Sequence, residues 1–483
     1  MTVERFDLAP DLSISRVLTG LWQVADMERD GKKVDPISAA DALTSYAKAG
    51  LTSFDMADHY GSSEEIAGVL RNTYASPVQL FTKWVPTPGP VKREDVRNAV
   101  QRALKRMHSD RIDLLQFHAW NYADPRWLDC LFWLKELKEE GLVHHLGLTN
   151  FDTAHLRIVI ESGIPVISNQ VCFSLIDRRA LHSMTDFCRQ HSIGLLAYGT
   201  VAGGLLSEKW LGKPEPSSSD LLSWSLMKYK RFIDAGGGWS VYQNILIAAG
   251  QVARKHRVSI PNIACRYILD QTAVAGVIIG ARPGRSEHIA ETLRIFSIKL
   301  DDEDRSMIEK AMANLKPAHS DCGDEYRRPP FLTASGDLSH HIETMPPPFQ
   351  SKKGNDDRTW ALSGTIWEDI GGFSRAVRRG NRIWVSGTTA THGKRSIGGN
   401  DPAAQAHFVI DKIEGALQSL GGSLSDVVRT RVFVRNVDDW EAIARVHGER
   451  FKNILPANTL VQATLVGEEY LVEMEAEALT ADS

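Results

Sequence analysis

Three successive apolar runs in the first part of the chain each stop at an ionisable side chain. LTSFD closes at Asp55, VQLFTK closes at Lys83, and RIDLLQFH closes at His118. Strands of a parallel sheet read as nearly continuous apolar runs because both faces of the sheet are covered. Polar sequence of helical character follows each run. The pattern therefore predicts strand–helix units that carry these three side chains at one end of one sheet.

The alternation of strands and helices continues downstream. Further apolar runs occupy residues 142–150, 165–170, 193–198 and 274–280, and amphipathic stretches such as residues 95–107 separate the strands. Sustained over about 300 residues, this alternation indicates an α/β protein with a (β/α)8 TIM barrel, whose reactive groups gather at the C-terminal face.

The pattern changes after residue 318. Residues 319–357 are rich in proline and mixed charge without a sustained period, which indicates a linker. Apolar alternation resumes in residues 358–483, where a compact α+β domain is expected, with two helices on one face of a mixed sheet. Its strands are expected at 381–389, 427–436, 458–465 and 470–479, and its helices at 403–420 and 440–454. The chain should thus comprise a barrel over residues 1–318, the linker and the smaller domain.

Composition narrows the class of protein. The 483 residues are too many for one barrel, and a formal net charge of -4 leaves no basic footprint for nucleic acid. The five cysteines are scattered without metal-ligand spacing, which fits reduced thiols. No apolar run approaches the roughly 20 residues of a membrane span, and the N-terminus does not read as a signal peptide. We expect a soluble, cytoplasmic protein with no metal and with neither a nucleic-acid nor a membrane partner.

Asp55, Tyr60, Lys83 and His118 form a set that can donate a proton to a carbonyl. A tyrosine phenol, with a pKa near ~10, is a poor acid at neutral pH. A cation beside it favours the phenolate, so Lys83 would lower the pKa of Tyr60, while Asp55 would pair with Lys83. His118 would hydrogen-bond the substrate carbonyl, and a nicotinamide cofactor would supply the hydride. Taken singly, the aspartate could be a helix cap and the histidine a core residue.

Residues 1 to about 318 resemble the aldo/keto reductases. The resemblance rests on Asp-x-Ala-x-x-Tyr-Gly at 55–61, on Lys83 and His118 at the next two strand ends, and on GLTNF at 147–151. It implies a tetrad of Asp55, Tyr60, Lys83 and His118, and NADP(H) as the cofactor ahead of NAD(H). It also implies that Thr149, Asn150 and Gln170 hold the nicotinamide carboxamide and that Tyr198 stacks on the ring.

Residues 280–292 are similar to the family's loop and helix start that grip the adenosine 2′-phosphate. The resemblance makes Arg282, Arg285, Ser286 and Glu291 candidates for that contact, whereas Thr292 replaces an asparagine that often contacts adenine. Arginines in a Gly/Pro-rich turn can also be plain surface charge.

Three tryptophans follow predicted strand ends near the proposed site. Trp22, Trp84 and Trp120 suggest an aromatic-walled cavity for a carbonyl compound with apolar or flat groups, although packing at the barrel rim is a comparable explanation. Residues 213–239 are expected to form a long loop that folds over the cofactor or to be an exposed insertion.

Residues 358–483 resemble the Rid/YjgF/YER057c family of reactive-imine deaminases, which implies a chorismate-mutase-like fold. The motifs are at 371–377, 383–388, 425–434, 456–463 and 472–476. The resemblance implies a homotrimer with ligand sites between subunits. Glu473 matches the family's acidic residue, whereas Asn458 stands where the deaminating branch has a carboxylate-binding arginine, and Phe373 replaces a tyrosine.

The sequence therefore predicts an NADP(H)-dependent oxidoreductase that reduces an aldehyde or ketone, or oxidises the corresponding alcohol or aldose. Tyr60 would be the proton donor, and the C-terminal domain would serve oligomerisation or ligand binding. An alternative is a bifunctional protein that hydrolyses imines or enamines in the second domain and reduces the released carbonyl in the barrel. A nucleotide-binding scaffold without turnover is a third possibility.

Overall fold

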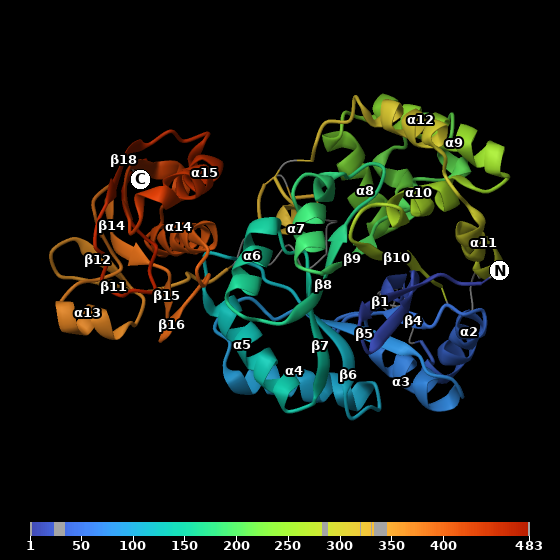
Figure 1. Ribbon diagram of the computed structural model, residues 1–483, viewed down its shortest axis with the longest axis horizontal. Helices are drawn as coiled ribbons and strands as arrows, with labels where there is room; N and C mark the ends of the chain where they lie inside the picture. The colour runs from blue at the N-terminus through green and yellow to red at the C-terminus, as the bar shows by residue number, and fades with distance from the viewer. Residues whose placement is uncertain are drawn as a thin grey trace.

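The first part of the chain forms a closed barrel of eight parallel strands in the order β10-β3-β4-β5-β6-β7-β8-β9 (Figure 1). The computed structural model describes residues 2–23, 34–282, 288–318, 320–329, 331–332 and 345–481. The barrel strands are β3 (Val17–Gly20), β4 (Ser53–Asp55), β5 (Gln79–Trp84), β6 (Ile112–Phe117), β7 (Val143–Thr149), β8 (Val166–Cys172), β9 (Gly194–Tyr198) and β10 (Val274–Gly280). The predicted (β/α)8 barrel is confirmed.

Helices cover the outside of the barrel. In α4, the buried residues recur at helical spacing, acidic residues open the first turn and basic residues close the last, which suits the helix dipole. The helices of this part are α2 (Pro36–Lys48), α3 (Ser63–Thr73), α4 (Arg93–Arg106), α5 (Arg126–Glu139), α6 (Thr153–Glu161), α7 (Met184–Gln190), α8 (Trp224–Ala235), α9 (Trp239–His256), α10 (Ile260–Leu269), α11 (Ile289–Leu293) and α12 (Asp302–Met312).

A hairpin of β1 (Arg5–Ala9) and β2 (Leu12–Ser15) closes the amino-terminal end of the barrel. Its Leu8 and Leu12 pack in one cluster with barrel-interior residues such as Phe81. Asp11 in the turn accepts hydrogen bonds from His144 and His145 at the start of β7, at 2.7 and 2.9 Å. With this end filled, a ligand can enter the barrel at the carboxyl ends of the strands.

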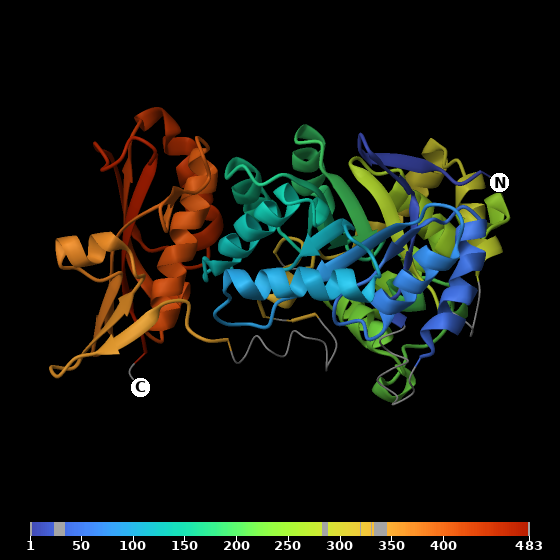
Figure 2. The same cartoon turned by 90° about the horizontal axis from the view of Figure 1, so that it is seen from below.

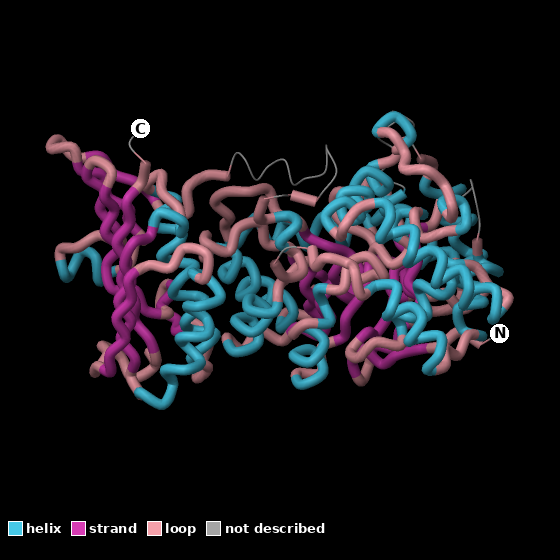
Figure 3. Tube along the Cα trace, turned by 90° about the horizontal axis from the view of Figure 1, so that it is seen from above, coloured by secondary structure: helices cyan, strands magenta, loops and turns pink. Residues whose placement is uncertain are grey.

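The second part is a mixed sheet in the order β11-β12-β13-β14-β19-β17-β18. Only β17 and β18 pair in parallel. Figures 2 and 3 show the sheet at the edge of the molecule away from the barrel, with α14 between the sheet and the barrel. Its elements are β11 (Gln350–Lys353), β12 (Arg358–Leu362), α13 (Ile366–Gly371), β13 (Ala376–Arg379), β14 (Arg382–Thr389), β15 (Thr391–His392), β16 (Arg395–Ser396), α14 (Pro402–Ser419), β17 (Val427–Val434), α15 (Trp440–Phe451), β18 (Ala457–Gln462) and β19 (Val472–Leu479).

Two segments differ from the sequence-based expectation. The stretch predicted as a linker, 319–357, contains β11, an edge strand of the second sheet, and residues 320–329, which pack against the barrel through Arg179 and Glu325, 2.8 Å apart. The expected long loop at 213–239 contains α8. Residues 224–235 do carry buried side chains at helical spacing, Tyr229, Phe232 and Ile233, whereas residues 320–329 are held by contacts with distant residues.

No helix in the described ranges has the length and apolar character needed to cross a membrane.

Candidate functional site

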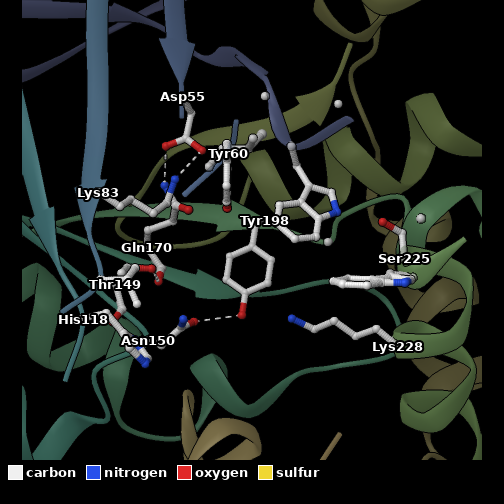
Figure 4. A pocket seen from close by; sticks show the side chains of 18 of the residues that line it. Asp55, Tyr60, Lys83, His118, Thr149, Asn150, Gln170, Tyr198, Ser225 and Lys228 are labelled. Atoms are coloured by element: carbon white, nitrogen blue, oxygen red, sulfur yellow. Dashed lines mark hydrogen bonds and ion pairs between the residues drawn. The ribbon is translucent and has the colours of Figure 1, made fainter. Parts of the chain in front are cut away.

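The carboxyl ends of the barrel strands surround an open cavity of about 1140 Å³ (Figure 4). Each of the eight strands contributes a residue to its lining, from the strand itself or just beyond its end. In strand order from β3 to β10 these are Gly20, Asp55, Lys83, His118, Thr149, Gln170, Tyr198 and Gly280.

The centre of the cavity floor is a buried ion pair. Lys83 Nζ lies 2.7 Å from Asp55 Oδ2 and donates to the Met56 carbonyl oxygen at 2.8 Å. Burial lowers the pKa of Lys83, and the Asp55 carboxylate opposes that shift. Lys83 Nζ is 5.3 Å from the centre of the Tyr60 ring, which packs edge-on against Trp22 at 4.8 Å. The structure thus brings Asp55, Tyr60 and Lys83 together.

Two glutamine side chains complete the hydrogen bonds of Asp55. Gln116 Nε2 and Gln170 Nε2 both donate to Asp55 Oδ1, at 3.1 and 2.7 Å. Gln170 Nε2 also donates to Gln116 Oε1 at 2.9 Å, so only its oxygen is left for a ligand. The sequence analysis missed Gln116. The sequence feature that could have identified Gln116 is its position two residues before His118 in the same strand. Alternate residues of a strand point to the same face, so Gln116 and His118 share one.

His118 presents a buried nitrogen with no partner among the described residues. Its Nδ1 lies 3.4 Å from the Thr149 carbonyl oxygen, and Nε2 makes no hydrogen bond. Burial, and then the nearby charge of Arg327, hold the pKa of His118 well below its ordinary value. The imidazole is therefore neutral at pH 7. A neutral ring carries one proton: on Nδ1 it serves the Thr149 carbonyl oxygen, and in the other tautomer, on Nε2, it can be donated to an oxygen in the cavity.

Thr149, Asn150 and Tyr198 lie together on one side of the cavity (Figure 4). Asn150 has a φ of 59° and donates its backbone N–H to the Gln170 carbonyl oxygen at 2.8 Å. Tyr198 Oη donates to Asn150 Oδ1 at 2.8 Å. Together with Gln170, the residues predicted to hold the nicotinamide therefore form one connected group.

Of the residues predicted to bind the adenosine phosphate, the two that the structure describes, Arg282 and Glu291, do not line the cavity. Arg282 is exposed and does not line the cavity, and Arg285 and Ser286 lie outside the described residues. Glu291 Oε2 is 3.4 Å from Arg294, and its backbone oxygen accepts from Asn262.

The three predicted tryptophans differ in whether they line the cavity. Trp22 and Trp120 line the cavity, but Trp84 does not, contrary to the prediction. Trp84 directly follows Lys83 in β5, so strand alternation turns it away from the barrel interior. There it is buried and packs against Phe117, with ring centres 5.6 Å apart.

Segments outside the barrel strands supply two further lining residues, Lys228 of α8 and Tyr326. Lys228 Nζ donates to Tyr326 Oη at 2.6 Å and lies 4.9 Å from the centre of the Tyr198 ring. The Tyr326 ring packs edge-on against His118 at 5.6 Å. No local pattern marked either residue, because each reaches the site through tertiary packing.

The family positions in the second domain are spread over the sheet. Asn458 of β18 is exposed and donates to Thr430 at 2.9 Å, while Glu473 lies in β19, beyond the intervening β17. Burial raises the pKa of Glu473, and Arg375 opposes that shift. Within one chain, Asn458 and Glu473 therefore do not line a common pocket.

The lining of the cavity fits a nicotinamide nucleotide. The unpartnered Nε2 of His118 belongs to a cavity that Tyr60 and Tyr198 also line. The chain's own residues can therefore hold a flat ring beside a polar group and offer a proton to an oxygen.

Several known proteins are similar to parts of this chain. The NADH-specific methylglyoxal reductase of Escherichia coli is 23% identical over 329 residues, which cover 62% of this chain and 95% of that protein. A glycerol dehydrogenase structure from Gluconobacter oxydans superposes with a TM-score of 0.54 at 23% identity, covering 66% of this chain and 98% of that one. An uncharacterized protein of Streptomyces coelicolor is 37% identical over 117 residues, or 24% of this chain and 87% of its own.

Two family models match the chain. The one described as Endoribonuclease L-PSP covers residues 366–480, and a member of the YjgF/YER057c/UK114 family from Mycobacterium tuberculosis is 39% identical, covering 26% of this chain and 99% of that one with a TM-score of 0.24. The one described as Aldo/keto reductase family covers residues 16–313, more than half of the chain. The chain therefore belongs to the aldo/keto reductase family of oxidoreductases and carries a YjgF-type domain after its barrel.

Proposed function

We propose that the chain is an NADP(H)-dependent oxidoreductase that interconverts an aldehyde or ketone with its alcohol, with Tyr60 as the proton donor in the reducing direction. The observation that carries this proposal is the buried Lys83–Asp55 pair beside Tyr60, in a cavity that also exposes His118.

The proton is held at the phenol oxygen of Tyr60. The ammonium of Lys83 stabilises the phenolate that remains after proton transfer, and Asp55 stabilises that ammonium against its burial. In the tautomer with its proton on Nε2, which gives up the 3.4 Å contact of Nδ1 with the Thr149 carbonyl oxygen, His118 donates to the substrate oxygen and so places the carbonyl near the phenol. A bound reduced nicotinamide supplies the hydride to the carbonyl carbon. In the oxidising direction, the Tyr60 phenolate accepts the alcohol proton.

The nucleotide is held by two sets of residues. Thr149, Asn150 and the Gln170 oxygen bind the carboxamide, while Tyr198 stacks on the ring. Arg282, Arg285 and Ser286 serve the 2′-phosphate, which favours NADP(H), whereas the carboxylate of Glu291 would repel that group. One relative is named for NADH, so both nucleotides belong in the test.

The substrate is a small carbonyl compound with an apolar or flat group. Trp22, Trp120 and Tyr326 supply aromatic faces to the cavity, which suit such a group.

The decisive experiment follows the loss of reduced-nicotinamide absorbance with the full chain, using NADPH and NADH against aldehydes, ketones and sugars. Tyr60→Phe should abolish turnover while leaving the nucleotide dissociation constant nearly unchanged. Retained turnover in that variant would exclude Tyr60 as the donor. Tyr74→Phe, away from the cavity, is the matched control.

We propose that the second domain assembles the protein as a homotrimer, an expectation based on its resemblance to YjgF-type proteins. Large apolar side chains on its surface, including Trp384 and Val461, support an interface. Imine or enamine hydrolysis by this domain is the less favoured function, because Asn458 is engaged with Thr430 and cannot replace an arginine clamp. Sedimentation equilibrium of the full chain would reveal the assembly, and a monomer would contradict it.

A further inference from the structure

A buried histidine joins the barrel to the second domain. His155 of α6 is 2% exposed, and α6 packs directly against α14 (Figure 1). His155 Nε2 lies 2.9 Å from Asp411 Oδ2 of α14, and Nδ1 lies 2.7 and 2.8 Å from the two carboxylate oxygens of Asp152. An imidazole between two buried carboxylates carries both ring protons. A chain of charge-assisted hydrogen bonds thus connects the two parts of the molecule.

The end of this chain in the second domain is firmly held. Asp411 Oδ1 accepts from Arg450 Nη1 of α15 at 2.6 Å, and Arg450 Nη2 donates to Glu414 at 2.7 Å. Asp411 and Arg450 are both buried, so loss of one partner would leave an uncompensated charge. The packing of α14 against α15 therefore fixes the position of Asp411.

The end of the chain in the barrel reaches the nucleotide side of the cavity. Asp152 caps α6 by accepting from the His155 backbone N–H at 2.7 Å, and it follows Asn150 by two residues. Asn150 lies in the left-handed region, a conformation that neighbouring contacts must hold in place. Asp152 is the last residue of the loop 149–152, so its hydrogen bonds to His155 anchor that end of the loop.

A second route leads from His155 to the same loop. The Tyr122 ring stacks on His155 at 3.4 Å, and the Arg327 guanidinium lies 4.2 Å from the centre of the Tyr122 ring. Arg327 Nη1 donates to the Asn150 carbonyl oxygen at 2.6 Å. Its Nε and Nη2 donate to the carbonyl oxygen of Ala119, the residue after His118. Both routes therefore reach the loop that carries Asn150, and the second also reaches Ala119, beside His118.

We propose that the second domain positions the nucleotide-binding loop 149–152 of the barrel through Asp411 and His155. Neither residue lines the cavity, so both are positioning residues. The proposal rests on the proposed function, because its ligand is the nicotinamide nucleotide. It implies a reciprocal coupling, in which bound nucleotide tightens the docking of α14 as much as docked α14 tightens nucleotide binding.

Hydrogen exchange on the unaltered full chain tests this coupling directly. Nucleotide binding is first measured by calorimetry with NADPH and NADH. Exchange is then compared with and without the nucleotide that binds. We expect slower exchange in the loop 149–152 and also in α14. Protection of the loop with unchanged exchange in α14 would overturn the coupling alone, whereas no binding of either nucleotide would overturn the proposed function and the coupling with it.

Two variants distinguish the effect of the Asp411–His155 contact from the effect of losing any ion pair between the barrel and the second domain. Asp411→Asn removes a charge from the chain described above, whereas Arg157→Gln breaks another ion pair between the two parts, with Asp401 at 2.6 Å. We expect Asp411→Asn to raise the dissociation constant and the KM for the nucleotide roughly 3- to 30-fold, with a smaller change in kcat. Arg157→Gln should leave all three quantities unchanged. Equal effects of the two variants, or none in a folded Asp411→Asn, would overturn the proposal. The exchange experiment needs no variant and decides the matter if Asp411→Asn does not fold.

Discussion

The cavity of the barrel and the open sheet face of the second domain differ in how far their ion pairs are exposed. In the barrel, Lys83 and Asp55 are buried side by side at the floor of the cavity. In the second domain, Arg431 and Glu475 border a hollow on the open face of the sheet and form an ion pair whose side chains are 42% and 31% exposed. Burial strengthens an electrostatic interaction and makes its loss costly, so the barrel pair can influence chemistry, whereas the exposed pair is largely screened.

The geometry of the two sheets explains the difference. A closed barrel brings the ends of eight strands to one point, so single residues far apart in the chain meet there. The open sheet spreads its matching positions, Asn458 and Glu473, over separate strands. Such a face gains a pocket only when another surface covers it. The described lining of the barrel cavity comes from one chain, whereas a pocket on the open sheet would need a further surface to cover it.

The largest expected effect comes from Lys83→Met. Asp55 would remain buried without its cation, which should lower the free energy of unfolding by about 3–5 kcal/mol and reduce kcat by roughly 10²-fold or more. Stopped-flow turnover and thermal unfolding measure the two effects. The double variant Lys83→Met with Asp55→Asn should regain stability but not turnover. Recovery of both would show that the pair serves only the fold.

The contact between the two parts should give the full chain a pH-dependent stability. Burial disfavours the imidazolium of His155, but Asp152 and Asp411 outweigh it and raise its pKa to about 9. A raised pKa stabilises the fold fully below the unfolded value near 6.5, and the contribution is lost as the pH rises through about 9. The thermal unfolding midpoint should therefore fall across that window, corresponding to roughly 3 kcal/mol.

His155→Gln is the control for this pH dependence. The variant should be less stable at neutral pH and should lose the part of the pH dependence that the histidine supplies. An unchanged slope in the variant would assign the effect to other groups.

Variants of two barrel tryptophans distinguish an effect on substrate binding from an effect on stability. Trp22→Leu should raise KM for aromatic carbonyl substrates roughly 3- to 10-fold, because an aromatic contact contributes about 0.5–1.5 kcal/mol, with little change in stability. Trp84→Leu should lower the unfolding midpoint and leave KM unchanged, since its side chain is buried outside the cavity. Steady-state kinetics and thermal unfolding of both variants provide the comparison, and a KM effect of Trp84→Leu would contradict the assigned positions.

The smallest effect is expected from Glu475→Gln on the open face of the second sheet. An exposed ion pair contributes about 0–1 kcal/mol, so the unfolding midpoint should move little and reductase kinetics should not change. The sedimentation profile of this variant sharpens the comparison. A shift toward smaller species would indicate that the pair lies in a contact between chains.

The sequence alone determined the elements and the face on which the chemistry lies. Apolar runs that stop at Asp55, Lys83 and His118 match β4 and the strand ends of β5 and β6, because a local period of apolar residues directly reports a buried strand. The helices at 403–420 and 440–454 correspond to α14 and α15 for the same reason. The two matched families follow from motifs that are likewise local in the chain.

Only the tertiary structure decided which distant residues complete the site. Tyr326 and Lys228 reach the cavity from segments expected to be a linker and a loop, and Trp84 turns away from it. His155 and Asp411 meet across 256 positions of sequence. Local periodicity records which face of an element is buried, but not what covers that face. Contacts between elements depend on how the whole chain packs, and no pattern within a single segment carries that information.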